Sequence, residues 1–92
     1  SKVIFFDRDG TLNVDPGYLS DPALVTLIPG VSKALGLLRR SGYELVVVTN
    51  QSAVARGKAT LGDVERVNER IAELLLAEDA DATLSGFLIC PH

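Results

Sequence analysis

Cysteine, histidine and long apolar runs are all scarce in this sequence of 92 residues. The single cysteine cannot form an internal disulfide, which agrees with a reducing compartment and leads us to expect a cytoplasmic protein. No apolar run approaches the roughly 18 to 20 residues of a membrane span, and no basic segment precedes an apolar leader with a small-residue cleavage site. We therefore expect no membrane partner.

Positive charge is also in short supply. The 9 Lys and Arg residues face 12 Asp and Glu residues, for a formal net charge of −3, whereas a nucleic-acid-binding domain normally carries a clustered basic face. Nucleic acid is therefore not expected as a partner, and a phosphorylated substrate would have to be attracted by local groups. Hydrophobic residues make up 47% of the chain and charged residues 23%, which is ordinary for a folded protein, and the length allows one small domain at most.

The most informative stretch is the apolar run Val3-Ile4-Phe5-Phe6, which leads into Asp7-Arg8-Asp9-Gly10. The run predicts a strand covered on both faces, as in a parallel α/β sheet, and the glycine marks a turn. Asp7 and Asp9 then lie where open α/β sheets form their ligand crevice. Two such close carboxylates either raise the pKa of one of them, which makes a proton donor, or bind a hard cation such as Mg²⁺; a plain Asp-Gly turn is the alternative. The Pro- and Gly-rich stretch 14–22 is expected to be a loop beside them, with Tyr18 a substrate contact or incidental packing.

A second strand is predicted from Tyr43 to Val48, and it ends in the polar turn Thr49-Asn50-Gln51-Ser52. An amphipathic helix that starts after Pro29-Gly30 and is closed by Gly42 completes a βαβ unit. Because such a crossover is parallel, Asp7 and Thr49 should be neighbours at one edge of the sheet. The Thr49 hydroxyl and the backbone N–H groups of the turn suit phosphate oxygens, although an ordinary polar turn has the same composition. The apolar face of the helix is expected to be Val31, Ala34, Leu35 and Leu38, with Arg39 and Arg40 as a solvated helix end.

The remaining chain predicts one more helix and a short third strand. Thr60, with Asp63 three residues later, forms a variant of the capping box at the start of the helix. The strand is expected from Leu84 to Ile89, directly before Cys90-Pro91-His92. The expected apolar stripe of the helix is Leu61, Val64, Val67, Ile71, Leu74 and Leu75, and the residues expected in solvent, with some i,i+4 pairing, are Glu65, Arg66, Glu69, Arg70 and Glu73.

Two of these stretches resemble known motifs. Phe6-Asp7-Arg8-Asp9-Gly10-Thr11-Leu12-Asn13 is similar to the first signature motif of the haloacid dehalogenase superfamily of phosphotransferases, and the Val-rich strand ending in Thr49-Asn50-Gln51-Ser52 is similar to the second. The resemblance implies that Asp7 is a nucleophile that becomes an aspartyl phosphate, while Asp9 protonates the leaving oxygen and later activates water. It also implies that Asp7 and Asp9 bind Mg²⁺, and that Thr49 and the backbone of Asn50 hold the phosphoryl group.

The run from Thr49 to Gly57 resembles more narrowly the branch of the histidinol-phosphate and heptose bisphosphate phosphatases. This likeness implies that Arg56 binds the phosphate end of the substrate, although Ala53 stands where the branch usually has glycine. Cys90 and His92 resemble half of a zinc-binding loop of the bisphosphatases. Because a tetrahedral zinc needs four ligands, this site is partial, and a structural Zn²⁺ is expected, if at all, only in the complete protein.

Together these patterns predict an α/β fold: a Rossmann-like parallel sheet of the haloacid dehalogenase type, with only its first βαβαβ portion present. Residues 1–92 would be the N-terminal part of one phosphatase domain. We expect the complete protein to be a Mg²⁺-dependent phosphatase of a small sugar- or metabolite-phosphate monoester, with the heptose bisphosphate type favoured, and the segment alone to be inactive. The alternatives are a histidinol-phosphate phosphatase, a polynucleotide 3′-phosphatase or, from another class, a non-catalytic fragment or interaction module. The oligomeric state is left open.

Overall fold

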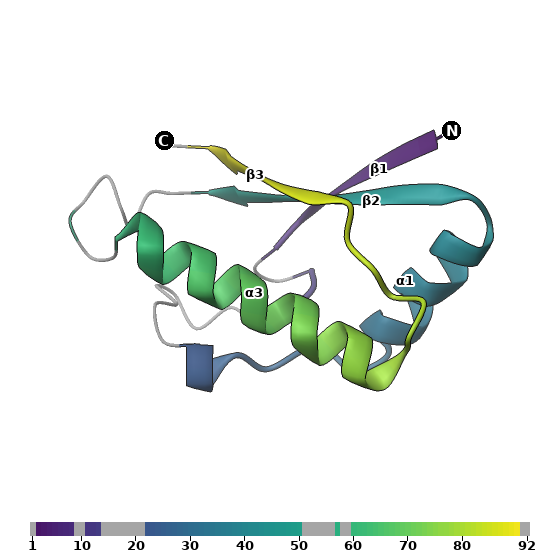
Figure 1. Ribbon diagram of the computed structural model, residues 1–92, viewed down its shortest axis with the longest axis horizontal. Helices are drawn as coiled ribbons and strands as arrows, with labels where there is room; N and C mark the ends of the chain where they lie inside the picture. The colour runs from purple at the N-terminus through teal and green to yellow at the C-terminus, as the bar shows by residue number, and fades with distance from the viewer. Residues whose placement is uncertain (1, 9–10, 14–21, 51–56, 58–59, 91–92) are drawn as a thin grey trace.

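The computed structural model describes residues 2–8, 11–13, 22–50, 57 and 60–90, with only the backbone of Asn50 and Cys90. Over these ranges strands alternate with helices in a β-α-β-α-β order (Figure 1). In chain order the elements are β1 (Lys2–Asp7), the 3-10 helix η1 (Pro22–Leu24), α1 (Val31–Arg40), β2 (Tyr43–Asn50), α3 (Leu61–Glu78) and β3 (Gly86–Cys90). The predicted order of elements is confirmed, and the third strand begins and ends slightly later than expected.

The three strands of the described chain form one parallel sheet in the order β1-β2-β3. The most valine-rich strand, β2, is the central one, and its Val47 is fully buried between Phe6 of β1 and Phe87 of β3 in the register of the sheet. A parallel pair needs a crossover, which α1 supplies between β1 and β2 and α3 supplies between β2 and β3. The predicted α/β class with a parallel sheet is therefore confirmed.

Both helices lie on the same side of this sheet, as Figure 1 shows with the strands edge-on above α1 and α3. The core fills the space between these two layers, because apolar side chains of the helices meet those on the inner face of the strands. Ile4 and Phe6 of β1 pack against this cluster from the sheet. Its fully buried members are Leu12, Leu35, Leu45, Val47, Val67, Ile71, Leu75 and Ala82.

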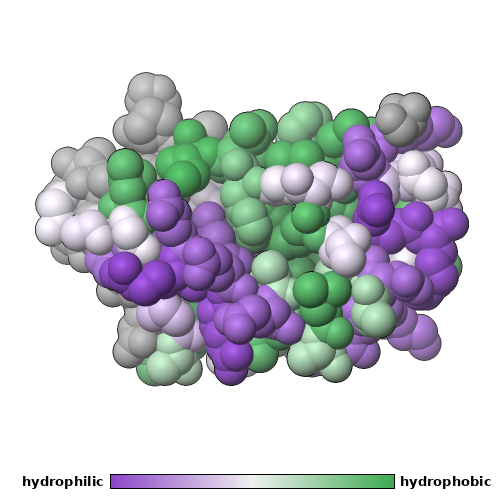
Figure 2. All heavy atoms as spheres, in the orientation of Figure 1, coloured by the Kyte–Doolittle hydropathy of each residue, from purple (hydrophilic) through white to green (hydrophobic). Residues whose placement is uncertain are grey.

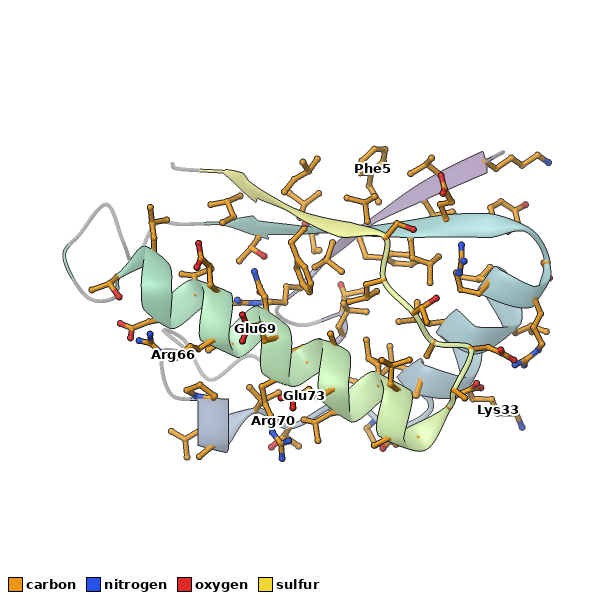
Figure 3. The ribbon with its side chains drawn as sticks, viewed as in Figure 1. Phe5, Lys33, Arg66, Glu69, Arg70 and Glu73 are labelled. Atoms are coloured by element: carbon orange, nitrogen blue, oxygen red, sulfur yellow. The ribbon has the colours of Figure 1, made fainter. Side chains whose placement is uncertain are left out.

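The expectation that β1 is covered on both faces is wrong for the described chain. Val3 is 45% exposed and Phe5 59% exposed, whereas their neighbours Ile4 and Phe6 face the core. Side chains alternate across a strand, so a sheet with helices on one side leaves every second residue of β1 uncovered. Figure 3 shows Phe5 pointing away from the helices, and Figure 2 shows hydrophobic residues along the strand side of the molecule. Leu88 and Ile89 of β3 are also exposed.

Helix α1 starts and ends at glycines with positive φ. Gly30 is the N-cap at φ 84°, and Gly42 follows the C-cap at φ 94°, as the predicted left-handed stop requires. The expectation that Arg39 lies in solvent at the helix end is corrected, because this residue is only partly exposed. Its guanidinium donates to Thr83 Oγ1 at 3.1 Å and to the Tyr43 carbonyl at 3.0 Å. The predicted apolar face also needs correction, because Ala34 is exposed while Ser32 and Gly36 are buried.

Helix α3 has the predicted start. The hydroxyl of Thr60 accepts from the Asp63 N–H at 3.0 Å, and the Asp63 carboxylate accepts from the Thr60 N–H at 2.9 Å, which completes a capping box. Leu61 departs from the predicted stripe, because it lies in the first turn and is 52% exposed. The five charged residues predicted to lie in solvent are exposed, and Figure 3 shows four of them along α3. In the described ranges, no helix has both the length and the apolarity to cross a membrane.

The capping box makes the stability of α3 dependent on pH. The N–H of Thr60 is the main cause that lowers the pKa of Asp63 below its ordinary value of 3.8, with a further contribution from Arg66. Because this pKa is depressed in the folded state, the carboxylate stabilises the fold above pH 3.8, and this stabilisation is lost as the pH falls through the depressed value. We predict that Asp63→Ala lowers the thermal midpoint at pH 7 and that this difference shrinks at about pH 2. An equal difference at both pH values would contradict the assignment.

Gly36 marks the close approach between α1 and the end of α3. A Cβ built at this position would lie 2.6 Å from the Cγ of Asp79, whose carboxylate accepts from the Asp81 N–H at 2.9 Å. We predict that Gly36→Ala lowers the free energy of unfolding by about 1–3 kcal/mol, since overpacking outweighs the gain in helix propensity.

Gly62→Ala is the matched control in α3, where the nearest atom to an added Cβ is the mobile end of Arg66 at 3.2 Å. It is expected to leave stability unchanged or raise it by up to about 1 kcal/mol. Denaturant titration of both variants measures the difference, and equal stabilisation by the two substitutions would show that Asp79 moves aside freely.

Candidate functional site

The carboxyl ends of the three parallel strands meet at one edge of the sheet. Asp7 ends β1, Asn50 ends β2 and Cys90 ends β3. In the register of the sheet Asp7 is paired with Val48, the residue before Thr49, and Asn50 is paired with Cys90. The predicted proximity of Asp7 and Thr49 is confirmed at the level of the backbone. This is the edge at which open α/β sheets bind ligands.

Asp7 stands at the point where the chain leaves the sheet. The residue is exposed, so its carboxylate is accessible to a ligand. The next residue, Arg8, still donates its N–H to the Val48 carbonyl at 3.2 Å, so the β1–β2 pairing extends one residue past the strand. The Arg8 carbonyl then accepts from Leu12 at 2.8 Å and from Thr11 at 3.3 Å. The chain therefore turns tightly after Asp7. The fully buried Leu12 attaches this turn to the hydrophobic core.

Thr49 carries the most unusual polar atom of this edge. The residue is 1% exposed, and its Oγ1 has no hydrogen-bond partner among the residues the structure describes. A buried hydroxyl without a partner is destabilising, because it has lost its hydrogen bonds to water. Since it lies next to the residue that pairs with Asp7, an oxygen of a ligand bound at Asp7 is a chemically suitable partner.

Arg8 and Asn68 form a buried polar pair that the motifs alone did not predict. Arg8 is 4% exposed and Asn68 5% exposed, and Nη1 of the arginine donates to Oδ1 of the asparagine at 2.9 Å. One signal was available: position 68 falls on the same helical face as Val64, Ile71 and Leu75, all of which are buried. An asparagine on such a face needs a polar partner, but its spacing does not say which one.

Several predicted site residues lie outside the described part of the chain. These are Tyr18, Asp9, Arg56 and His92, together with the side chains of Asn50 and Cys90. Their proposed roles in proton transfer, substrate binding and metal binding therefore stay predictions. Ala53, the departure from the branch pattern, lies outside it as well.

The chemistry of this edge suits a magnesium ion better than a zinc ion. In the ranges that the structure covers, no group of three or more His, Cys, Asp or Glu side chains could hold a metal. Mg²⁺ does not need such a group, because it is commonly held by one or two carboxylates together with waters and substrate phosphate, and Asp7 offers an exposed carboxylate. A closed zinc site needs four ligands, and the sequence contains one Cys and one His.

Comparison with known proteins finds phosphatases. A D-glycero-beta-D-manno-heptose-1,7-bisphosphate 7-phosphatase from Salmonella typhi is 47% identical over 90 residues, which are 98% of this chain and 47% of that protein. A crystal structure from Mesorhizobium loti, assigned to the haloacid dehalogenase-like phosphatases, has a TM-score of 0.89 at 42% identity and is matched over 99% of this chain and 42% of its own. The D,D-heptose 1,7-bisphosphate phosphatase of B. bronchiseptica, complexed with magnesium and phosphate, has a TM-score of 0.87 at 27% identity over 100% of this chain and 51% of its own.

No family model matches the chain. The chain spans about half the length of the curated relatives it matches, since 47% of the Salmonella protein is covered. What the relatives share with it is therefore the portion that carries Asp7 and Thr49.

Proposed function

The chain belongs to the haloacid dehalogenase superfamily, and from this we propose that the whole protein is a phosphatase that hydrolyses a phosphate monoester with Asp7 as its nucleophile. A carboxylate oxygen of Asp7 attacks phosphorus, and the bond from phosphorus to the ester oxygen breaks. Asp9 supplies the proton to the departing alkoxide and then removes one from the water that attacks the aspartyl phosphate. Orthophosphate leaves and the Asp7 carboxylate is regenerated.

Magnesium is the proposed metal, held by Asp7 and Asp9. The exposed carboxylate of Asp7 fits the hard oxygen ligands that this ion prefers, and the phosphatase of B. bronchiseptica is complexed with magnesium and phosphate. When bound, Mg²⁺ would offset the negative charge that Asp7 and the phosphate bring together. The partial zinc site at Cys90 and His92 is proposed only for the complete protein, where further ligands would have to come from other residues.

The observation that carries this proposal is the buried hydroxyl of Thr49 beside the strand partner of Asp7. Its Oγ1 lacks a partner in the described chain, so a phosphoryl oxygen would supply a hydrogen bond that none of the described residues makes there. Arg56 is proposed to bind the rest of the substrate, because its planar guanidinium matches phosphate in a bidentate fashion. The backbone N–H of Asn50, at the end of β2, is proposed to bind phosphate as well.

Thr49→Val tests this role through opposite effects on stability and activity. Removing a buried hydroxyl that has no partner among the described residues should raise the free energy of unfolding by roughly 1 kcal/mol, while loss of a phosphate donor should lower phosphatase turnover by about 10²-fold. Thr83→Val is the matched control, because its hydroxyl accepts from Arg39 at 3.1 Å and lies before β3, away from Asp7. The control should be slightly less stable with turnover unchanged. Full activity of Thr49→Val would remove Thr49 from the site.

The proposed substrate is a small phosphorylated sugar of the heptose bisphosphate type, because relatives that are 44% to 48% identical carry that activity in their names. The net charge of −3 disfavours a polynucleotide 3′-phosphatase, for which single-stranded DNA would have to inhibit turnover with a steep dependence on salt. A strong preference for histidinol phosphate over a heptose bisphosphate would favour the sister activity. The expected cytoplasmic location is part of this proposal and rests on the single cysteine.

A further inference from the structure

Arg8 occupies an unexpected place for a charged residue of a ligand-binding turn. It follows Asp7 directly, at the edge of the sheet that faces the proposed substrate, yet it is 4% exposed. Its guanidinium is directed into the layer of helices, where Nη1 donates to Asn68 Oδ1 of α3 at 2.9 Å. The two residues are separated by 60 positions in the chain. The pair therefore joins the turn that carries the nucleophile to a distant helix.

The backbone of Arg8 organises the same turn. Its N–H donates to Val48 of β2, and its carbonyl accepts from Thr11, Leu12 and Asn13 at 3.3, 2.8 and 3.4 Å. Asp7, paired with Val48, is the last residue of β1 and directly precedes this group of hydrogen bonds. A rotation of Arg8 would therefore move the peptide that fixes the direction of the Asp7 side chain.

The place of Asn68 on α3 extends this argument to the element that follows β2 in the chain. Helix α3, which begins at Leu61, is the next described helix or strand in the chain after β2, the strand that contains Thr49. Val67 and Ile71, on either side of Asn68 on the buried face, are fully buried, so the helix is fixed against the sheet at this point. The Arg8–Asn68 hydrogen bond thus connects the turn after Asp7 to α3, the helix that follows Thr49 in the chain.

A guanidinium is an unusual choice for a role in packing alone. Taking a charge out of water is costly, and apolar side chains of similar volume often fill such a site at no loss of stability. A guanidinium instead supplies several donors in a fixed plane, which holds the groups around it in a defined geometry.

On the basis of the proposed function, we propose that Arg8 is a positioning residue for the phosphoryl transfer and that Asn68 is its anchor. The Asn68 carboxamide holds the guanidinium, and through the Arg8 backbone this fixes the carboxylate of Asp7 in line with the phosphoryl group. A displacement of about 1 Å in such a group can lower a rate by about 10²-fold without any loss of binding.

The test uses the full-length protein with magnesium and a heptose bisphosphate. Asn68→Leu should lower kcat by about 10- to 100-fold with KM changed by less than about three-fold. Asn68→Asp keeps an acceptor for the guanidinium and should restore kcat to within about three-fold of the parent. Ser32→Ala is the matched control: it removes a hydrogen bond of 2.7 Å to Glu78 that also joins a buried residue to α3, and it should leave kcat unchanged.

A double variant separates positioning from stability. Arg8→Met with Asn68→Leu replaces the polar pair with apolar side chains, so the thermal midpoint should recover toward that of the parent while kcat stays low. Recovery of kcat together with the midpoint would overturn the proposal, and so would a kcat of Asn68→Leu within two-fold of the parent.

Amide hydrogen exchange at Leu12 supplies a readout that does not depend on turnover. Because the Leu12 N–H donates to Arg8, Asn68→Leu should speed its exchange at least about ten-fold while Ser32→Ala should not. If Asn68→Leu speeds exchange at Leu12 but leaves kcat unchanged, the positioning role of Arg8 is overturned, while the proposed function still stands. Turnover that persists in Asp7→Asn would overturn the proposed function instead, whatever the exchange at Leu12.

Discussion

Replacing Asp7 with Asn in the full-length protein is expected to lower phosphatase turnover by at least about 10³-fold, because the amide oxygen is too weak a nucleophile to form the acyl phosphate. The side chain is exposed at the end of β1, so the fold should tolerate the change and the thermal midpoint should hardly move. Steady-state hydrolysis and a thermal melt of the same preparation measure both effects.

Asp81→Asn is the appropriate control for this substitution. Asp81 is also an exposed aspartate, but it pairs at 2.8 Å with Arg40, and both residues come before a strand rather than after one. The pairing raises the pKa of Arg40 and involves no group of the proposed site. The control should therefore turn over at the parent rate, and an equal loss in both variants would show that the effect of Asp7→Asn is not specific.

The 92 residues on their own are expected to show turnover at least about 10²-fold below that of the full-length protein, since more than one electrostatic contribution to the transition state would be missing. The resemblance to the superfamily implies a later lysine and distal carboxylates for the phosphate and the metal, and the chain matches only 47% of the Salmonella protein and 51% of the B. bronchiseptica phosphatase. A second reason to expect low turnover is that one face of the sheet is uncovered, with Phe5 59% exposed. The strands that carry the site are therefore packed on one side only.

The same segment is expected to bind zinc weakly or not at all. Cys90 and His92 can supply two of the four ligands that a tetrahedral site needs. A phosphatase assay of the segment beside the intact protein, together with a zinc titration, measures both expectations. Turnover equal to that of the intact protein, or one tightly bound zinc per monomer, would show that the segment is complete as it stands.

Local patterns in the sequence predicted most of the fold. The apolar runs at β1 and β2, the Thr60–Asp63 capping box and the stop at Gly42 each depend on residues a few positions apart, and all of them are confirmed. The parallel crossover then followed from the length between the strands, and it predicted Asp7 and Thr49 as neighbours. In the register of the sheet Asp7 is opposite Val48, the residue before Thr49.

The errors concern which side of an element is covered, which depends on distant parts of the chain. Phe5 looked like a core residue, but both helices lie on the other face of the sheet. The apolar residues Ala34 and Leu61 were assigned to buried faces for the same reason, and both are exposed. The pairing of Arg8 with Asn68 joins positions 60 residues apart, and no local spacing indicates it.

The central claim is that Asp7 becomes covalently phosphorylated, and the most direct test is the stereochemical course at phosphorus. A substrate made chiral at phosphorus with oxygen isotopes is hydrolysed by the full-length protein, and the configuration of the product phosphate is determined. Attack by Asp7 followed by attack of water inverts phosphorus twice, so we predict net retention. Net inversion would mean that water attacks the substrate directly, and it would contradict the role of Asp7 as nucleophile.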